Sequence, residues 1–140
     1  MSVQIANTEE EMQTVREIRS TVFIDEQNVP PEEEWDEYEE QSTHLLAQVS
    51  GTWAGAGRVR FSGRAGKAER ICVLKQFRGT GVGKEIMQAL EDYVASQGAE
   101  SVILNAQTHA KDFYEVLGYI ITSDEFLDAG IPHVAMEKRL

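Results

Sequence analysis

The stretch KAERICVLKQFRGTGVGK, residues 67 to 84, predicts a strand (Lys67 to Leu74), a short turn, a glycine-rich loop at residues 78–83 and then a helix. Glycines at alternate loop positions remove the β-carbons that would separate the backbone from a ligand. Amides at the start of a helix have no intrahelical acceptor, and the helix dipole adds partial positive charge there. The stretch therefore predicts a binding site for a phosphate or pyrophosphate.

Positive charge gathers around this loop. Residues 58–84 hold eight basic side chains and one acid, Glu69, whereas the whole chain has 13 basic and 24 acidic residues. This distribution favours an anion site over the alternative, an ordinary tight turn that leads into a surface helix.

Neither common nucleotide-binding motif fits the loop. A P-loop needs GxxxxGK[ST], but Glu85 follows Gly83 and Lys84, and a Rossmann GxGxxG would place its last glycine on Lys84 or Ile86. The pattern that fits is Arg-x-x-Gly-x-Gly. In this motif the chain resembles the GNAT superfamily of acyl-CoA-dependent N-acetyltransferases. The resemblance implies that the loop holds the pyrophosphate of coenzyme A and that the preceding strand pairs with the pantetheine arm.

A second motif strengthens the resemblance. Ala110-x-x-Phe113-Tyr114-x-x-x-Gly118-Tyr119 is similar at every fixed position to the family signature A-x-x-[FL]-Y-x-x-x-G-[FY]. The resemblance implies that Tyr114 points its hydroxyl at the coenzyme A sulfur and acts as a general acid. A phenol (pKa about 10) and a thiol (about 8.5) are close enough for useful proton transfer. Core packing of Tyr114, with its hydroxyl bonded elsewhere, is the alternative.

The resemblance also implies the rest of the acetyl-CoA site. The acetyl carbonyl would be held by a backbone amide of residues 71–73. The family usually has Asn three residues before the helix Ala, but this chain has Gln107 there and Asn105 two residues earlier, so either amide could contact the pantetheine. The cofactor-binding residues expected are Ile71, Cys72, Val73, Arg78, Gly79, Thr80, Gly81, Val82, Gly83, Lys84, Asn105 and Tyr114.

Acetyl transfer to an amine also needs a proton acceptor. An amine of pKa about 10 is neutral in only about one molecule per thousand at pH 7, a cost of roughly 4 kcal/mol. Glu69 lies four residues before Val73 on the strand that should border the cofactor. The resemblance places a glutamate used as base or substrate ligand there, so Glu69 is the candidate base. A surface glutamate paired with Arg70 or Lys67 is an equal alternative.

Length, composition and charge narrow the classes of protein and of ligand that remain. The 140 residues suit one domain, which the resemblance implies is an acyl-CoA N-acyltransferase domain. The chain has no apolar run long enough for a membrane helix and no signal peptide. The single Cys72 fits the reducing cytoplasm and is expected to be a buried hydrophobe and not a nucleophile, so transfer should be direct. A net charge of −11 argues against nucleic acid and favours a small cationic amine. The three histidines share no metal-ligand spacing, so no metal is expected.

Residues 25–40 carry nine acids and no base. The run is either a solvated face or a rim that attracts the amine. Pro30 and Pro31 exclude a continuous helix, although Glu32 to Glu40 could form one, which would place Trp35 and Tyr38 on one face. The segments VFIDEQNVPPEEEWDE and FLDAGIPH resemble a small bacterial branch of the family, the ElaA and YjcF type.

The predicted fold is α+β, a GNAT-like mixed and mostly antiparallel sheet of six or seven strands with about four helices. Strands are expected at residues 2–6, 43–49, 52–61, 67–74, 101–105, 119–122 and 133–138, with 126–132 as a connection. The parallel strands Lys67–Leu74 and Ser101–Asn105 should splay apart to admit acetyl-CoA.

Three functions remain open. The chain is expected to be an N-acetyltransferase, with homodimerisation undecided. A non-catalytic acyl-CoA sensor or protein-interaction module would bind coenzyme A without turnover. A nucleotide-phosphate binder unrelated to coenzyme A would bind ATP or NAD.

Overall fold

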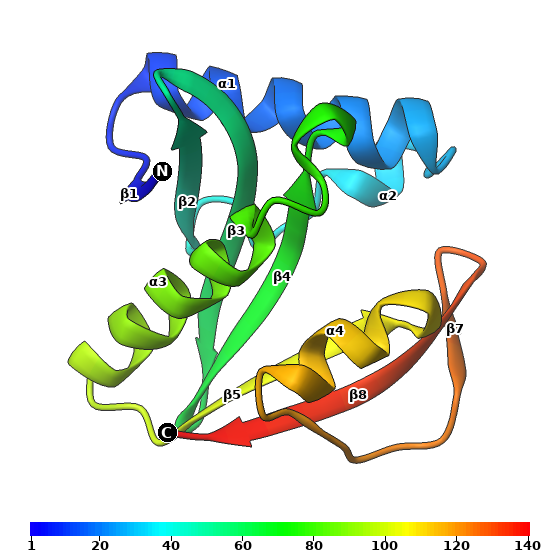
Figure 1. Cartoon of the computed structure of the whole chain (residues 1–140). Coiled ribbons are helices and arrows are strands. Elements are labelled where there is room, and N and C mark those ends of the chain that lie inside the picture. The colour runs from blue at the N-terminus through cyan, green and yellow to red at the C-terminus, as the bar shows by residue number, and fades with distance from the viewer.

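The strand before the glycine loop lies at the centre of an eight-stranded sheet, and the helix after the loop packs against a face of that sheet (Figure 1). The computed structural model describes all 140 residues. The elements in chain order are β1 (Ser2–Ile5), α1 (Glu9–Arg19), the π-helical η1 (Ser20–Glu26), α2 (Pro31–Glu34), β2 (Thr43–Val49), β3 (Thr52–Ser62), β4 (Ala65–Val73), the 3-10 turn η2 (Lys75–Phe77), α3 (Val82–Ser96), β5 (Ser101–Gln107), the 3-10 turn η3 (Thr108–Ala110), α4 (Lys111–Val116), β6 (Ile120–Ile121), β7 (Phe126–Asp128) and β8 (Ile131–Arg139).

The sheet is mixed, as predicted, with the order β1-β2-β3-β4-β5-β8-β6 and with β7 paired to β8. Every neighbouring pair is antiparallel except β4 and β5. The prediction of six or seven strands was wrong because residues 126–132, expected as a connection, contain β7. Positive φ angles at Ala129 (51°) and Gly130 (75°) close the β7–β8 hairpin in two residues.

The first helix begins at a capping box formed by Thr8 and Glu11. After Arg19 the chain continues to Glu26 as a π-helix that buries Val22 and Phe23. Wide π turns are rare in proteins and are frequent at functional sites.

The second helix differs from the expectation for Glu32–Glu40. Only Pro31–Glu34 is helical, because Trp35 has an extended backbone (φ −91°, ψ 117°). Trp35 and Tyr38 therefore do not share a helix face. Each ring instead covers a guanidinium group, of Arg19 at 4.7 Å and of Arg60 at 3.8 Å respectively.

The splaying of the central strands is confirmed. β4 and β5 pair only from Ala65–Ser101 to Ala68–Leu104, although the strands run on to Val73 and Gln107. Figure 1 shows the two strands diverging from a common point near the C-terminus.

Two apolar clusters fix this divergence from opposite sides. One joins α3 and α4 to the sheet, and the other packs α1 and η1 against it. Tyr93 of α3 is half-buried, and its hydroxyl contacts the hydroxyl of Thr43 at 3.0 Å. No helix has the length and apolarity needed to cross a membrane.

Candidate active site

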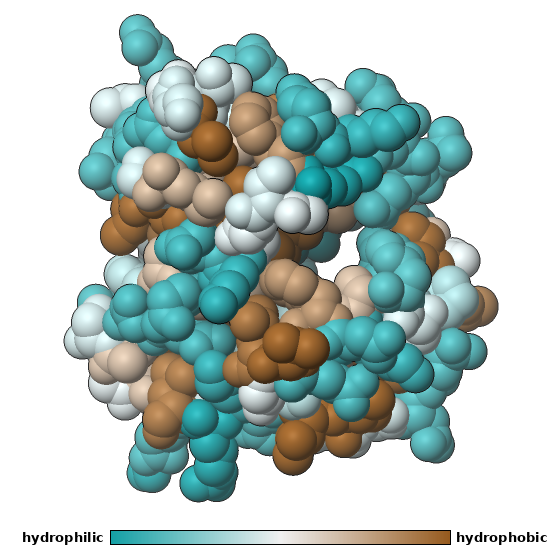
Figure 2. Space-filling view, viewed as in Figure 1, coloured by the Kyte–Doolittle hydropathy of each residue, from teal (hydrophilic) through white to brown (hydrophobic).

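A pocket of about 1080 Å³ lies where β4 and β5 part. Its walls come from η1, α2, β4, the glycine loop, β5, α4 and the β7–β8 hairpin. The space-filling view in Figure 2 shows an opening between the two halves of the molecule. Small-molecule sites usually measure about 300–1,000 Å³, so this pocket has room for a cofactor and a second ligand.

The glycine loop presents a row of free donors. The amides of residues 79–84 have no acceptor within the protein, and the first helical bond of α3 comes from Glu85 to Gly81. Gly79 (φ 78°) and Gly81 (φ 93°) adopt left-handed conformations that favour glycine, and a β-carbon at either would meet no atom within 4 Å. These amides are therefore available to an anion.

Tyr114 lines the same pocket from α4. Its side chain is 8% exposed, and its hydroxyl makes no hydrogen bond within the protein. The ring packs edge-on against Phe113 and Tyr119, with centroid distances of 4.9 and 5.8 Å. Burial raises the pKa of Tyr114, so the phenol keeps its proton throughout the neutral range.

A β-bulge bends β4 beside the pocket. Ala56 pairs with Cys72 and Arg58 with Glu69, so two residues of β4, Arg70 and Ile71, lie opposite one residue of β3. Arg70 has a left-handed backbone (φ 57°), which is uncommon for a residue other than glycine. The bulge removes β4 residues from regular pairing at the point where the two central strands separate.

Known proteins resemble the chain over nearly its whole length. The family model described as "Acetyltransferase (GNAT) domain" matches residues 5–140. The chain belongs to the GNAT family of acetyltransferases. It is 50% identical over 139 residues to YjcF of Bacillus subtilis, an uncharacterised N-acetyltransferase, and the match covers 99% of each chain. This GNAT protein is accordingly an acetyl-CoA-dependent acetyltransferase.

Solved structures show the same fold. The crystal structure of Escherichia coli ElaA aligns over 98% of each chain, with a TM-score of 0.83 and 21% identity. An aminoglycoside 6'-N-acetyltransferase complexed with coenzyme A aligns over 99% of this chain and 97% of its own, with a TM-score of 0.80 and 17% identity. At these identities the likeness concerns the fold alone.

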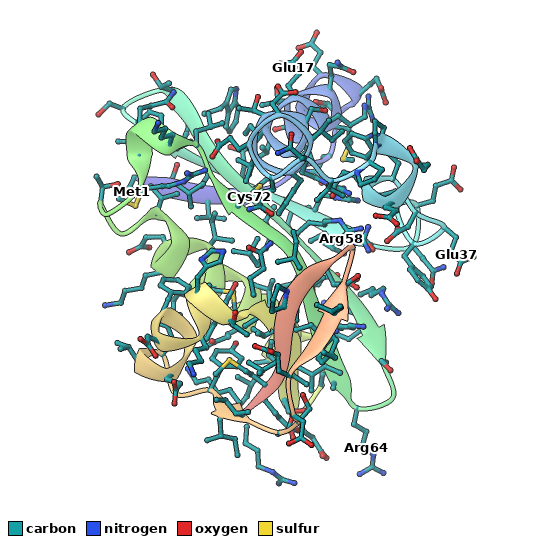
Figure 3. The ribbon with its side chains drawn as sticks, turned by 90° about the vertical axis from the view of Figure 1, so that its right-hand side faces the viewer. Met1, Glu17, Glu37, Arg58, Arg64 and Cys72 are labelled. Carbon is teal, nitrogen blue, oxygen red and sulfur yellow. The ribbon has the colours of Figure 1, made fainter.

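The structure brings most of the predicted cofactor residues of this GNAT protein to one pocket. Thr80 is the exception, because it does not line the pocket and its hydroxyl donates to the carbonyl of Phe77. Cys72 lies in the strand beneath α1 (Figure 3). It is buried, and burial raises its pKa to about 12, so it is the inert thiol expected and not a nucleophile.

The two basic residues of the loop differ in their surroundings. Nε of Arg78 donates to the carbonyl of Val73 at 2.9 Å, and its terminal nitrogen pairs with Glu26. Arg78 therefore ties the loop to β4 and η1. Lys84 is exposed and forms no ion pair, so its ammonium is free to meet an anion above the α3 amides.

Asn105 and Gln107, the two alternatives for the pantetheine contact, also differ. Nε2 of Gln107 donates to Gln27 at 2.8 Å, and its Oε1 lies 2.6 Å from Nε2 of His109. Asn105 is exposed in the pocket and its side chain has no partner in the protein. Asn105 is therefore the amide available to a ligand.

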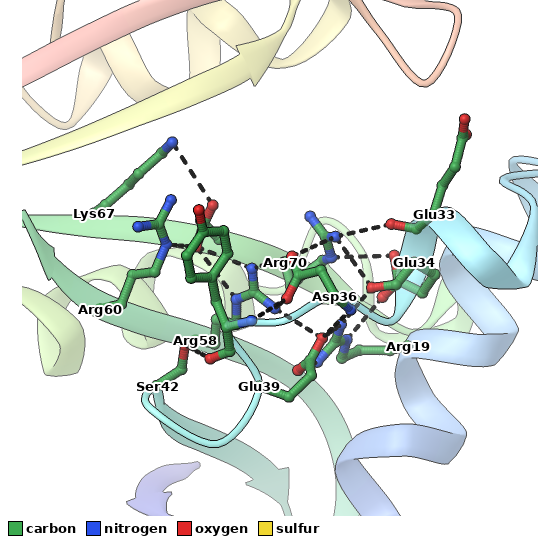
Figure 4. A network of polar contacts seen from close by, with 12 residues as sticks. Arg19, Glu33, Glu34, Asp36, Glu39, Ser42, Arg58, Arg60, Lys67 and Arg70 are labelled. Carbon is green, nitrogen blue, oxygen red and sulfur yellow. Dashed lines mark hydrogen bonds and ion pairs between the residues drawn. The ribbon is translucent and has the colours of Figure 1, made fainter.

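Glu69 belongs to a cluster of ion pairs, whose basic members Arg58, Arg60 and Lys67 are labelled in Figure 4. Its carboxylate lies 3.0 Å from Arg58, 2.8 Å from Arg60 and 3.8 Å from Lys67. Burial favours the protonated acid, but the hydrogen bond from Arg60 and the charge of Arg58 outweigh it and lower the pKa of Glu69. Arg70, one of the partners considered from sequence, does not contact Glu69 and pairs instead with Glu34 and Asp36.

The same cluster explains much of the acidic segment. Glu34, Asp36 and Glu39 pair with buried Arg19 and Arg58. Part of the acidic run is therefore neither a solvated face nor a substrate rim, because it is neutralised by arginines from α1 and β3. The remaining carboxylates of the run that form no ion pair are those of Asp25, Glu32, Glu33, Glu37 and Glu40.

The cluster predicts an acid-labile fold. Burial opposes ionisation of Asp36, but hydrogen bonds from Arg58 and the Tyr38 amide lower its pKa from 3.8 to about 2. Carboxylates with lowered pKa, also including Glu39 and Glu69, stabilise the fold above their unfolded pKa, and this contribution is lost as the pH falls through the folded values. We expect the free energy of unfolding in urea to decrease between pH 4 and pH 2. An Asp36→Asn variant should show a smaller decrease, and a wild-type curve that is flat over this range would contradict the assignment.

Several pocket residues were not found from the sequence. Phe23 comes from η1, Gln27 directly follows it, and Asp128 and His133 come from the β7–β8 hairpin. The sequence offered two signals, the segments VFIDEQNVPPEEEWDE and FLDAGIPH that resemble the ElaA and YjcF branch and that contain these four residues. Their positions in the sequence did not show that they line the pocket.

Proposed function

We propose that residues 1–140 act as one N-acyltransferase domain that moves acetyl from acetyl-CoA directly to a primary amine of a small cationic compound. The observation that carries this proposal is the continuity of the pocket, which joins the free amides of the loop to Tyr114 and to unpaired carboxylates. A single buried thiol is compatible with work in the cytoplasm.

The cofactor end is formed by local backbone. In the proposal, the amides of residues 79–84 hold the diphosphate and Lys84 adds a positive charge. The pantetheine arm runs along Ile71–Val73 of β4, with Asn105 facing it across the gap. A backbone amide beside the bulge polarises the acetyl carbonyl, and such donors stabilise the charge that develops on the oxygen.

Tyr114 is the proposed general acid. Its phenol is protonated, faces the pocket and has no competing acceptor in the protein. It can therefore donate to the thiolate sulfur as the C–S bond breaks. Transfer in a ternary complex agrees with the inert state of Cys72.

The acceptor end carries free negative charge. Glu33 and Asp128 line the pocket, are exposed and form no ion pair. We propose that they attract the ammonium groups of the substrate. Glu69 also lines the pocket. Because its pKa is lowered, its side chain stays ionised at neutral pH and is a weak proton acceptor. Its proposed part in catalysis is therefore mainly to stabilise positive charge on the substrate.

The test is release of free thiol from acetyl-CoA with a panel of primary amines, including diamines, amino sugars and amino acids. Turnover with a cationic amine would support the proposal. Binding of coenzyme A without turnover of any amine would indicate the sensor instead. Thermal protection by ATP or NAD but not by coenzyme A would indicate the nucleotide binder.

The role of the glycine loop in binding coenzyme A can be tested separately. Gly81→Ala should raise the Kd for coenzyme A about tenfold, or about 1.4 kcal/mol, because alanine is strained at φ 93° and the loop backbone that presents the amides must shift. Gly98→Ala is the matched control, since Gly98 has φ 84° and equally open surroundings at the end of α3 but does not line the pocket. Isothermal titration should show the affinity loss for Gly81→Ala alone. Equal affinities in the two variants would refute this role of the loop.

A further inference from the structure

The proton acceptor for the substrate amine is not evident among the carboxylates of the pocket. Glu34 and Glu69 are both paired with arginines. Glu33 and Asp128 are exposed carboxylates, which are weak bases at neutral pH. A histidine is better matched to a proton acceptor that works near pH 7.

Two histidines line the pocket, and they differ in their free nitrogens. His109 is exposed, and its Nε2 lies 2.6 Å from Oε1 of Gln107. His133 is 8% exposed, and its Nδ1 lies 2.7 Å from the carbonyl of Ile131. A carbonyl oxygen only accepts, so Nδ1 of His133 carries the hydrogen and Nε2 of the neutral ring carries a lone pair.

The free nitrogen of His133 faces the pocket in a fixed orientation. Nε2 makes no hydrogen bond within the protein and is not among the buried polar atoms that lack a partner, so it remains accessible. The ring stacks on Phe126, with centroids 6.0 Å apart and planes at 22°. The hydrogen bond to the backbone and the stacking on Phe126 together fix the orientation of the imidazole. A general base must be positioned in this way.

Strand register places His133 beside Gln107 in the wall of the pocket. It lies directly opposite Gln107 in the β5–β8 pair, so both side chains lie on the same sheet face. Gln107 reaches Gln27, the residue that follows η1, on that face. The charged and titratable residues that line the pocket with His133 are Glu33, Glu34, Lys67, Glu69, Arg70, Cys72, Arg78, Lys84, His109, Tyr114 and Asp128.

We propose that Nε2 of His133 is the general base that takes a proton from the substrate ammonium, an inference that rests on the acetyl-transfer function proposed above. The first ammonium proton goes to Nε2 and then to water. The neutral amine attacks the thioester carbonyl, a C–N bond forms, and the C–S bond breaks. Tyr114 protonates the departing thiolate, and the second proton lost by nitrogen returns to the Tyr114 oxygen through water. The products are the acetamide, coenzyme A as a thiol and one released proton.

The test compares two variants with an amine that the panel shows to be acetylated. His133→Asn keeps a donor near the Ile131 carbonyl but has no titrating lone pair. We expect kcat/KM at pH 7 to fall about 100-fold in this variant. We also expect its pH profile to lose the acidic limb, the part in which kcat/KM decreases as the pH is lowered. Glu69→Gln should lower kcat/KM but keep that limb. The opposite pattern, with the limb lost in Glu69→Gln and kept in His133→Asn, would overturn the proposal.

A second measurement does not need a folded His133 variant or an acceptor. Side-chain ¹⁵N NMR of the wild-type protein should show the neutral ring of His133 as the Nδ1–H tautomer. An Nε2–H tautomer for His133 would overturn the proposal. If no amine is acetylated by the wild type, the function itself fails, whereas turnover with an unchanged His133→Asn profile removes only the role of His133.

Discussion

Tyr114→Phe is expected to lower kcat about 100-fold while the Kd for coenzyme A and the melting temperature change little. The hydroxyl bonds to no group in the protein, so its removal breaks no interaction that stabilises the fold. It would remove the only proton that this side chain can supply to the thiolate, and positioned general acids typically contribute about 10²- to 10⁴-fold. Steady-state kinetics with the best amine of the panel, together with titration of coenzyme A, would measure both effects.

Tyr119→Phe is the matched control for this substitution. The Tyr119 hydroxyl donates to Glu91 at 2.8 Å, away from the pocket, and Glu91 also pairs with Lys138. Loss of a buried hydrogen bond to a charged group costs about 1.5–3 kcal/mol. We therefore expect Tyr119→Phe to lower stability and preserve kcat, the reverse of Tyr114→Phe. Similar kcat values in the two variants would remove Tyr114 from the mechanism.

Arg58→Met should destabilise the fold by about 3–5 kcal/mol, the usual cost of breaking a buried ion pair by removing one partner. The Arg58 side chain is fully buried, and its guanidinium contacts Asp36, Glu39 and Glu69 at 2.7 to 3.0 Å. Without it, these carboxylates lose much of their compensating charge, and the segment that carries α2 loses its main attachment to β3. Urea unfolding followed by tryptophan fluorescence would measure the change.

Arg64→Met tests whether burial, and not the loss of any arginine, causes this effect. Arg64 projects into solvent from the β3–β4 turn, whereas Arg58 lies inside the molecule (Figure 3). Its side chain is 86% exposed and lies 3.4 Å from Glu100. Exposed pairs contribute about 0–1 kcal/mol. Equal losses of stability in the two variants would show that the buried cluster contributes no more to stability than an exposed ion pair does.

The sequence was most informative where the functional groups are local. The free amides and the left-handed glycines lie within a few consecutive residues, so their arrangement follows from the strand–loop–helix order. Tyr114 was likewise found from a short motif, and the gap between β4 and β5 was expected from the family resemblance.

The partners of the acidic segment were harder to predict. Arg19 and Glu39 are 20 residues apart in the sequence, and Arg58 and Asp36 are 22 apart. The sequence of an acidic run is the same whether its carboxylates face solvent or pair with buried arginines. Composition does not show which segments pack against each other in the fold.

The sequence by itself determined a mixed sheet with a bare anion-binding loop and a tyrosine beside it, since consecutive backbone groups and short motifs fix these features. Only the tertiary structure decided that residues 126–133 form a hairpin, that His133 joins the pocket and that Glu69 is held by Arg58 and Arg60. These features depend on strand register and on packing between distant segments, which set where a side chain points and which charges surround it.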